Sequence, residues 1–354
     1  MSDQNKRNKE ELYIELVFKL LYLILGLLIF IGALVYINIA GVPDVFKQTE
    51  KIATTDSSVV VEVKLPISDL WKAPDASTII NEKNAELISY GKKLIANTSL
   101  YLGPNGTIAH ISNGMNCQNC HLEAGTKPFG NNYSAVASIY PKFRERSGAM
   151  ENIYKRVNDC FQRSLNGKAL DTLGKEMQAI KSYIVWLGKD VKKGEKPKGA
   201  GLTELKNMER AADPEKGKLI YVQKCLSCHG TRGEGKKNVD DFSFQYPPLW
   251  GENSYNDGAG LFRLSRFAGY VKSNMPLGAG YDNPQLTDEE AWDVAAFVNS
   301  QARPKKDLSK DWPKIAAKPF DHPFGPYADP FPESQHKYGP FNDIIAFKKK
   351  NVKK

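Results

Sequence analysis

The sequence predicts a mainly α-helical protein with two similar domains, a transmembrane helix before them and an extended tail after them. Three observations predict this class. Apolar residues recur at helical spacing in several segments, whereas the sustained alternation typical of strands does not occur. One short pattern occurs twice, starting at residues 117 and 225. A hydrophobic content of 41% in 354 residues is enough for packed cores.

The N-terminal segment from Leu21 to Asn38 carries no charge and is about long enough to span a membrane as a helix. It is preceded by the basic residues Lys6, Arg7, Lys9 and Lys19. The positive-inside rule therefore predicts that residues 1–43 form a cytoplasmic N-terminus and a single-pass anchor, with the body in the periplasm. The alternative is a cleaved signal peptide, but the apolar run is longer than usual and no Ala-x-Ala-type site follows it.

The remainder of the chain divides by composition. We expect a tether at 44–75, a first domain at 76–191, a linker at 192–212, a second domain at 213–303 and a C-terminal extension at 304–354. The linker is rich in Lys, Gly and Pro. The extension is dense in Pro, Phe and Tyr, so we expect it to pack along the body.

Each domain is expected to contain a helix before the repeated motif and an amphipathic helix after it. Gly91-Lys-Lys-Leu-Ile precedes the first motif, and Gly217-Lys-Leu-Ile precedes the second. The later helix of the first domain has the apolar stripe Leu173, Met177, Ile180, Ile184 and Leu187. In the second domain, Thr287 and Glu290 predict a capping box ahead of the stripe Ala291, Val294, Ala295 and Val298.

The repeated motif is Cys-x-x-Cys-His, the attachment sequence of c-type haem. The thiols that would bond to the porphyrin are Cys117, Cys120, Cys225 and Cys228. His121 and His229 would then ligate the two irons. A zinc site or a thioredoxin-like pair is disfavoured because both copies carry His directly after the second Cys. The motifs therefore predict two covalently bound haem c groups in two cytochrome c-type domains.

The second axial ligand of each iron must come from elsewhere in the chain. Met275, in Asn-Met-Pro-Leu-Gly, lies in a loop setting after the second motif, which favours ligation over packing. Met177 lies on an apolar stripe, so core filling is the better interpretation, and Met150 lies on another. Cys160 remains, the one cysteine outside the two motifs.

Cys160 is expected on a helix over residues 149–166, with Gly167 suited to its C-terminal cap. At about 100° per residue it lies at the border of the apolar stripe, with Arg156 and Arg163 on its polar side and Ser164 on the other. The guanidinium groups would favour thiolate and bind an oxyanion. The alternative is an ordinary buried cysteine, but an unpaired thiol is a liability in an oxidising compartment.

Overall charge and the remaining histidines add less. A net charge of +9 suggests affinity for anions. No stripe of interleaved aromatic and basic residues supports binding of nucleic acid, so we expect none. For His110 a site role and a plain loop role are equally open. His322 and His336, in the extension, are interpreted as structural.

The segment RVNDCFQRSLNGKAL at 156–170 resembles the region around the active-site cysteine of periplasmic di-haem thiosulfate dehydrogenases. Further similar stretches are SYGKKLIANTSLYLGPNG at 89–106, GMNCQNCHLEAGTKPF at 114–129 and YNDGAGLFRLSRFAGYVKSNMP at 255–276. The resemblance covers most of the chain after the N-terminal segment. The transmembrane anchor is not a general feature of this family.

The resemblance implies that two thiosulfates are joined into tetrathionate with release of two electrons; some members of the family favour the reverse reaction. It implies that Cys160 is the axial and catalytic cysteine of the first haem, and that Arg146, Arg156 and Ser164 line an anion pocket. Arg163 is added from helix geometry alone. Electrons would pass through the second haem to an external acceptor such as a cytochrome c.

Two details stay open. In the family the second haem's sixth ligand varies among Met and Lys residues, some near the segment aligned with Gly260-Leu261-Phe262, and this chain has neither there. That departure strengthens Met275, with Lys272 as a weaker competitor. The rival functions are tetrathionate reduction at the same site, a sulfur-oxidation (Sox) type cytochrome that acts with a carrier protein, and a membrane-tethered electron carrier without substrate chemistry.

Overall fold

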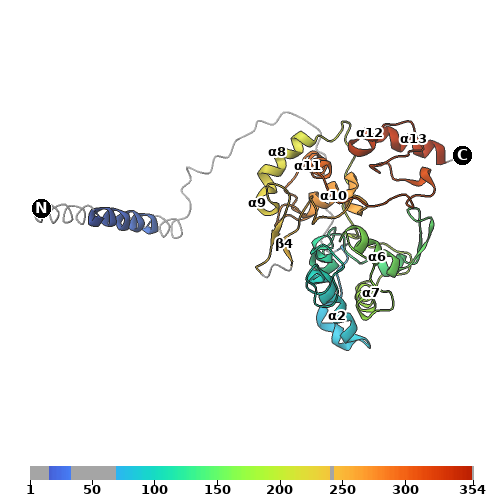
Figure 1. Cartoon of the computed structure of the whole chain (residues 1–354), viewed down its shortest axis with the longest axis horizontal. Helices are drawn as coiled ribbons and strands as arrows, with labels where there is room; N and C mark the ends of the chain where they lie inside the picture. Colours follow the sequence, from blue (N-terminus) through green and yellow to red (C-terminus); the bar gives the residue numbers. More distant parts are fainter. Residues whose placement is uncertain (1–15, 33–68, 240–242, 353–354) are drawn as a thin grey trace, which may run out of the picture. The chain divides into compact units, whose positions relative to one another are not determined.

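The computed structural model describes residues 16–32, 69–239 and 243–352 (Figure 1). The chain divides into two units, residues 1–63 and 64–354. In the first unit, residues 16–32 form one helix with exposed side chains. Across the described residues, no helix is sufficiently long and apolar to cross a membrane. The predicted span continues to Asn38, and its last part, residues 33–38, lies outside the described residues.

The second unit is mainly helical, as predicted, and its first part carries the first Cys-x-x-Cys-His motif. Its elements are η3 (Ala76–Asn81), α2 (Ala85–Ala96), α3 (Thr98–Leu102), η4 (Cys117–Asn119), α4 (Leu122–Gly125), α5 (Val136–Ile139), β1 (Lys142–Arg144), β2 (Ala149–Glu151), α6 (Ile153–Arg163) and α7 (Lys175–Leu187). The strands β1 and β2 form an antiparallel hairpin.

The core of this first part forms where α2 packs on α7. Gly91 permits the close crossing, because a Cβ at this position would lie 2.0 Å from the carbonyl oxygen of Ala179. Met177 is fully buried, in agreement with its interpretation as a core residue. The prediction that Leu173 lies on the apolar stripe of this helix is wrong. Leu173 precedes α7, is 86% exposed and belongs to the turn that leads into the helix.

The part that follows carries the second motif. Its elements are α8 (Pro214–Lys224), α9 (Leu226–His229), β3 (Lys236–Lys237), β4 (Phe244–Tyr246), η5 (Gly260–Phe262), α10 (Leu264–Asn274) and α11 (Asp288–Ser300). Gly217 lets α8 approach α11, because a Cβ there would lie 1.9 Å from the carbonyl oxygen of Asp293. The predicted capping box at the start of α11 is confirmed: Glu290 N–H donates to Thr287 Oγ1 at 3.1 Å, and Thr287 N–H donates to Glu290 Oε2 at 2.8 Å.

The C-terminal segment contains η6 (Ile315–Ala317), α12 (Glu333–Tyr338) and α13 (Asn342–Val352). Phe341 and Ile344 are buried in the core formed by α8, α10 and α11. Asp321, which is 1% exposed, accepts from Nε of Arg263 at 2.8 Å and from the backbone N–H of Ser265 at 3.1 Å. Apolar burial and a buried ion pair thus attach this segment to the body.

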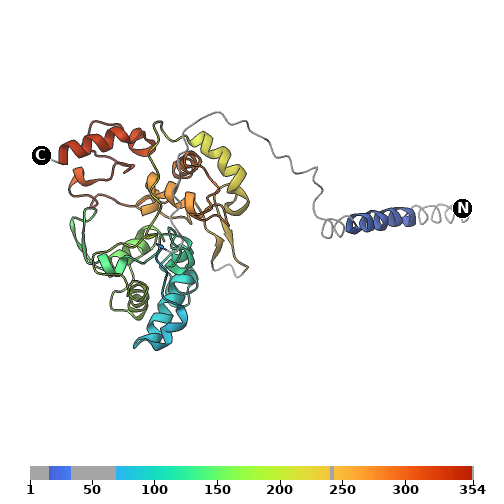
Figure 2. The ribbon, with the colours of Figure 1, turned by 180° about the vertical axis from the view of Figure 1, so that it is seen from behind.

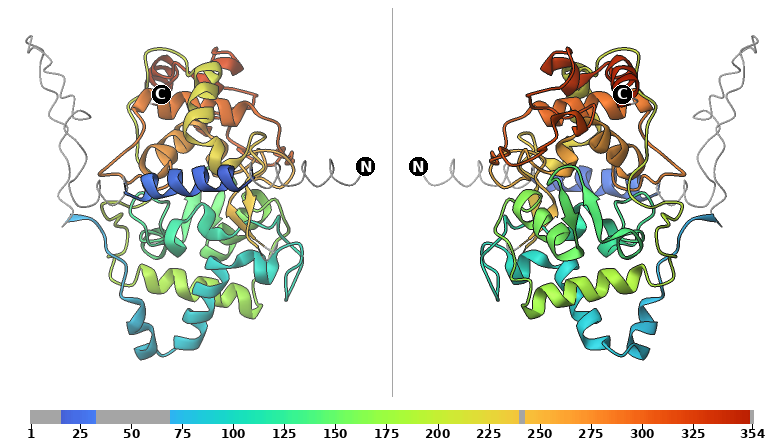
Figure 3. Two further views of the ribbon diagram at one scale, coloured as in Figure 1. Left: turned by 90° about the vertical axis from the view of Figure 1, so that its left-hand side faces the viewer. Right: turned by 90° about the vertical axis from the view of Figure 1, so that its right-hand side faces the viewer.

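The two helix groups of this unit are distinct in all views. Figures 1 and 2 show α2, α6 and α7 at one end and α8 and α11 at the other, with α12 and α13 beside the latter. In the side views of Figure 3 the C-terminal segment again lies with α8 and α11. Side chains bridge the groups: Tyr270 Oη donates to the carbonyl of Asn119 at 2.9 Å, and Asn113 Nδ2 donates to that of Ser254 at 3.0 Å.

Candidate functional site

The helix that carries Cys160 begins later than the sequence suggested. Residues 149–151 belong to strand β2, so Met150 is 64% exposed and does not lie on a helical stripe. Helix α6 starts at Ile153 because the side chain of Asn152 accepts a hydrogen bond from the N–H of Lys155 at 3.0 Å, a typical N-cap. The predicted helix over 149–166 is therefore wrong in its first turn, where strand pairing replaces helix.

The end of α6 is fixed around Cys160. The carbonyl oxygen of Cys160 accepts from the N–H of Leu165 at 3.0 Å, and the N–H of Gly167 donates to the carbonyl of Phe161 at 2.8 Å. Gly167 is needed for a close approach, because a Cβ there would lie 1.8 Å from the carbonyl oxygen of Ile111. The positive φ of 42° falls on Asn166. Cys160 thus occupies a rigid last turn.

Cys160 lines a cavity of 120 Å³ together with the first haem-attachment motif. The predicted site residues on this cavity are Cys117, Cys120, His121, Arg156, Cys160 and Ser164. Nη1 of Arg156 donates to Sγ of Cys160 at 3.2 Å. The pKa of Arg156 is raised, chiefly by the negative charge of Cys160. The cavity therefore holds the sulfur of Cys160 and the guanidinium of Arg156 in direct contact.

His121 is presented as an iron ligand should be. Its Nδ1 lies 2.5 Å from the carbonyl oxygen of Asn131, so Nδ1 carries the proton and Nε2 keeps its lone pair. Burial lowers the pKa of His121 to about 4, which keeps the ring neutral. The ring stacks on Tyr133 with centroids 4.5 Å apart, which fixes its orientation. The free Nε2 and the fixed ring orientation suit His121 to bind a haem iron.

The second motif lines a larger cavity of 580 Å³. The predicted site residues on it are Cys120, Cys225, Cys228, His229 and Met275. Nδ1 of His229 lies 2.9 Å from the carbonyl oxygen of Pro247, which again leaves Nε2 free, and burial lowers the pKa of His229. The other lining residues are mostly apolar, among them Phe267, Val271, Val294 and Val298. This cavity also fits a haem.

The two candidates for the second haem's remaining ligand differ in their contacts. Met275 follows α10 directly and lines the cavity. Lys272 does not line it; its Nζ donates to the carbonyl of Leu286 at 2.8 Å and pairs with Asp288 at 2.7 Å. Because Lys272 already has two partners, the geometry favours Met275.

The two cavities share part of their walls. Asn116 and Cys120, both from the first motif region, line the 120 Å³ cavity and the 580 Å³ cavity alike. A haem attached at the first motif would therefore adjoin the cavity that the second motif lines.

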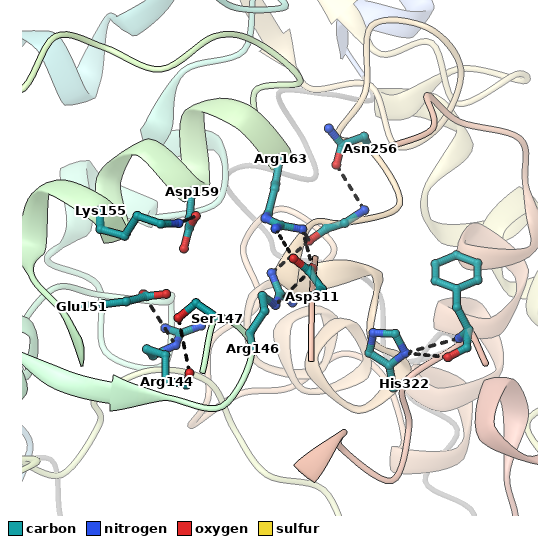
Figure 4. Close-up of polar contacts among 12 residues, drawn as sticks. Arg144, Arg146, Ser147, Glu151, Lys155, Asp159, Arg163, Asn256, Asp311 and His322 are labelled. Carbon is teal, nitrogen blue, oxygen red and sulfur yellow. Dashed lines mark hydrogen bonds and ion pairs between the residues drawn. The ribbon is translucent and has the colours of Figure 1, made fainter. Parts of the chain in front are cut away.

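Arg146 and Arg163 do not line the first cavity with Cys160. Figure 4 shows the two side chains converging from the β1–β2 hairpin and from α6 onto Asp311. The guanidinium of Arg163 donates to both carboxylate oxygens of Asp311, at 2.9 and 2.7 Å. Nη1 of Arg146 donates to the carbonyl of Gly258 at 3.1 Å. The predicted arginine set is thus divided between a cavity and a neighbouring ion-pair cluster.

Sequence reasoning missed several residues of this region. Asp311 is 148 positions from Arg163, and no local pattern marks it as the arginine's partner. The carbonyl of Asn131 also has no sequence signal, since any residue supplies one. His110, left open, is exposed and lines neither cavity.

Comparisons with known proteins agree with these features. Residues 108–192 match the family model described as SoxA/TsdA, cytochrome c domain, and residues 214–302 match the model described as Cytochrome c. With the two Cys-x-x-Cys-His motifs, these matches mean that the chain carries covalently bound haem c.

Relatives that match about two thirds of the chain are also found. The chain is 38% identical over 244 residues to thiosulfate dehydrogenase of Psychrobacter arcticus, covering 68% of this chain and 71% of that protein. It is 34% identical over 250 residues to thiosulfate dehydrogenase of Allochromatium vinosum, covering 70% and 89%. The solved thiosulfate dehydrogenase (TsdBA) from Marichromatium purpuratum superposes with a TM-score of 0.62 at 30% identity, over 68% of this chain. This chain covers 51% of that longer one.

Proposed function

The chain belongs to the thiosulfate dehydrogenase family, and from this premise we propose that it joins two thiosulfate anions into tetrathionate with release of two electrons. The observation that carries the proposal is the contact between Nη1 of Arg156 and Sγ of Cys160, at 3.2 Å, inside the cavity lined by His121. A nucleophilic sulfur beside a fixed cation suits a substrate that is both a sulfur compound and a dianion.

The proposed chemistry balances in two steps. The Cys160 thiolate and the outer sulfur of one thiosulfate form an S–S bond, giving Cys160–S–S–SO3⁻ and two electrons. The outer sulfur of a second thiosulfate then attacks the sulfur that bears the sulfonate. Tetrathionate forms, and the bond between that sulfur and Sγ of Cys160 breaks. Cys160 leaves as the thiolate with which it began. The haem groups, when bound, supply the one-electron acceptors.

The residues of the first cavity have separate roles in this proposal. Cys160 is the proposed nucleophile, and Cys160 and His121 would hold the iron of the first haem. Arg156 offsets the repulsion between two dianions and an anionic sulfur. Ser164, on the same cavity wall, offers a hydroxyl to a sulfonate oxygen.

The second cavity is proposed to serve electron transfer alone. His229 and Met275 would hold the iron of the second haem there, and the mostly apolar lining supports this proposal. Because Cys120 lines both cavities, the two attached groups would adjoin, which suits transfer between them. An external carrier such as a cytochrome c would then accept the electrons.

The deciding experiment compares wild type with Cys160→Gly, each with both haems confirmed. Thiosulfate is supplied with an electron acceptor and, separately, tetrathionate with a reduced donor. We expect the variant to lose activity in both directions by about 10³-fold or more. Gln162→Ala is the matched control, since Gln162 lies on the same helix and lines neither cavity.

Each outcome discriminates among the functions considered. Full activity in Cys160→Gly would refute the cysteine mechanism. A wild type inactive in both directions would favour an electron carrier without substrate chemistry. The ratio of the two wild-type rates shows whether tetrathionate formation or tetrathionate reduction is preferred.

We further propose that the body is periplasmic and is held at the cytoplasmic membrane by the N-terminal segment. The support is the uncharged run from Leu21 to Asn38 with basic residues before it. Cell fractionation is the test: the full chain is expected in the membrane fraction, and a chain beginning at residue 44 behind a cleavable export signal is expected in the periplasmic extract. Recovery of the full chain in the periplasmic extract would contradict the anchor.

A further inference from the structure

The C-terminal segment reaches back to the arginines beside the first cavity. Asp311 lies between Arg163 and Arg146 (Figure 4). It accepts two hydrogen bonds from Arg163, at 2.9 and 2.7 Å, and one of its oxygens is 3.9 Å from Nε of Arg146. A bidentate pair fixes the plane of the guanidinium as well as its position.

Trp312, the residue after Asp311, contacts both the backbone and the side chain of Arg146. The N–H of Trp312 donates to the carbonyl oxygen of Arg146 at 2.7 Å. The Trp312 ring centroid lies 5.8 Å from the guanidinium carbon of Arg146, within the range of a cation–π contact. Gly258 adds a shared acceptor, because its carbonyl oxygen lies 3.1 Å from Nη1 of Arg146 and 3.4 Å from Nη1 of Arg163. The arginines come from the first part of the unit, and their partners come from the second part and the tail.

Charge makes Asp311 necessary to this arrangement. The side chains of Arg146 and Arg163 are only 14% and 12% exposed, and Asp311 is 12% exposed. Burial, together with the charge of Arg163, lowers the pKa of Arg146 to about 10. Two buried cations would repel each other strongly without the carboxylate, and removing one partner of a buried pair is costly. With Asp311 present, the three groups carry a net charge of +1.

The cluster connects directly to the turn that bears Cys160. Arg163 is the last residue of α6, three positions after Cys160, and Ser164 beside it lines the first cavity. Nε–H of Arg146 is buried and has no hydrogen-bond partner among the described residues, so one donor of the cluster is unused.

We propose that Asp311 is a positioning residue for the substrate site: through its two bonds to Arg163 it fixes the end of α6, so that Ser164 and Cys160 keep their places on the wall of the first cavity. The inference rests on the proposed function, since that function places the anion beside Cys160 and Ser164. Asp311 itself touches the arginines and acts through them.

The test compares Asp311→Asn with Asp293→Asn in the full chain with both haems attached. Asp293 is a matched control because it is also a buried aspartate that accepts two hydrogen bonds from one arginine, Arg210, and neither residue lines a cavity with Cys160 or Arg146. We expect Asp311→Asn to raise the KM for thiosulfate about tenfold with a smaller change in kcat, because Ser164, next to Arg163, is displaced from the anion. Asp293→Asn is expected to keep the wild-type KM within about twofold, although it lowers the thermal midpoint.

A double-mutant cycle with Arg163→Gln shows whether the effect passes through that arginine. The change in KM of Asp311→Asn/Arg163→Gln is expected to be smaller than the product of the two single changes, because both remove the same contact. Multiplicative effects would overturn the inference, as would an unchanged or lowered KM in Asp311→Asn or an equal rise in Asp293→Asn. A wild type without activity would instead contradict the proposed function, so the two failures are distinguishable.

Discussion

The two Cys-x-x-Cys-His motifs are built into similar scaffolds but face different surroundings. In both, the following histidine gives Nδ1–H to a backbone carbonyl, of Asn131 in one case and of Pro247 in the other. The first cavity measures 120 Å³ and has a charged wall, where Arg156 donates to Cys160. The second measures 580 Å³, and the ligand candidate on its wall, Met275, is uncharged.

The two regions share the features that attach a haem and differ in the features that would determine what the haem does. Attachment needs the motif and a buried neutral histidine, which both regions have. In the proposed function, substrate chemistry needs a nucleophile beside a counter-charge, and the first cavity supplies this as the contact between Arg156 and Cys160. The two regions therefore share a scaffold and differ in the side chains that face the cavity.

The largest expected effect tests the shared scaffold. A Cβ at Gly91 or at Gly217 would lie 2.0 or 1.9 Å from a carbonyl oxygen of the facing helix. We expect Gly91→Ala and Gly217→Ala each to reduce the free energy of unfolding by about 3 kcal/mol, measured by chemical denaturation. Gly260→Ala is the control, because nothing lies within 4 Å of its added Cβ.

The outcome also tests the comparison itself. Similar losses in the two helix crossings support one scaffold used twice. A loss at only one of them would show that the two regions are less alike than their motifs suggest.

The next prediction tests the contact between Arg156 and Cys160 in the first cavity. Arg156→Gln is expected to lower kcat/KM for thiosulfate about 10²-fold, because it removes the cation in contact with Cys160. Arg156→Lys keeps the charge and is expected to recover part of the loss, but a single ammonium does not reproduce the guanidinium geometry. Steady-state assays measure both, and activity within about twofold of wild type in Arg156→Gln would remove the arginine from the mechanism.

The sequence predicted those parts of the fold that depend on local pattern. The capping box of Thr287 and Glu290 and the buried position of Met177 were both found, since each follows from residues a few positions apart. The start of α6 was predicted too early, because pairing of β2 with β1 overrides helical spacing at Met150. Leu173 was assigned to the core although it lies before the helix that it was meant to continue.

Long-range electrostatics accounts for most of what the sequence missed at the site. Helical spacing placed Arg163 near Cys160, yet its guanidinium pairs with Asp311 from the tail. Arg146 likewise contacts Gly258 and Trp312, which are distant in sequence. Such partners depend on how domains and tail meet, which no periodicity encodes. The roles of all these residues in catalysis and ligation stay predictions.

The smallest effect concerns the second cavity. Met275→Leu is expected to change the visible absorption of the oxidised protein and to lower the reduction potential of the second haem, because a thioether ligand raises it. A drop of 59 mV in this potential makes electron entry into the second haem about tenfold less favourable. For each such drop we expect steady-state turnover to fall about tenfold. A single turnover of thiosulfate at Cys160 is expected to be unchanged. Lys272→Gln is the control, since Lys272 bonds to Leu286 and Asp288; a changed spectrum in this variant, with none in Met275→Leu, would assign the ligand to the lysine instead.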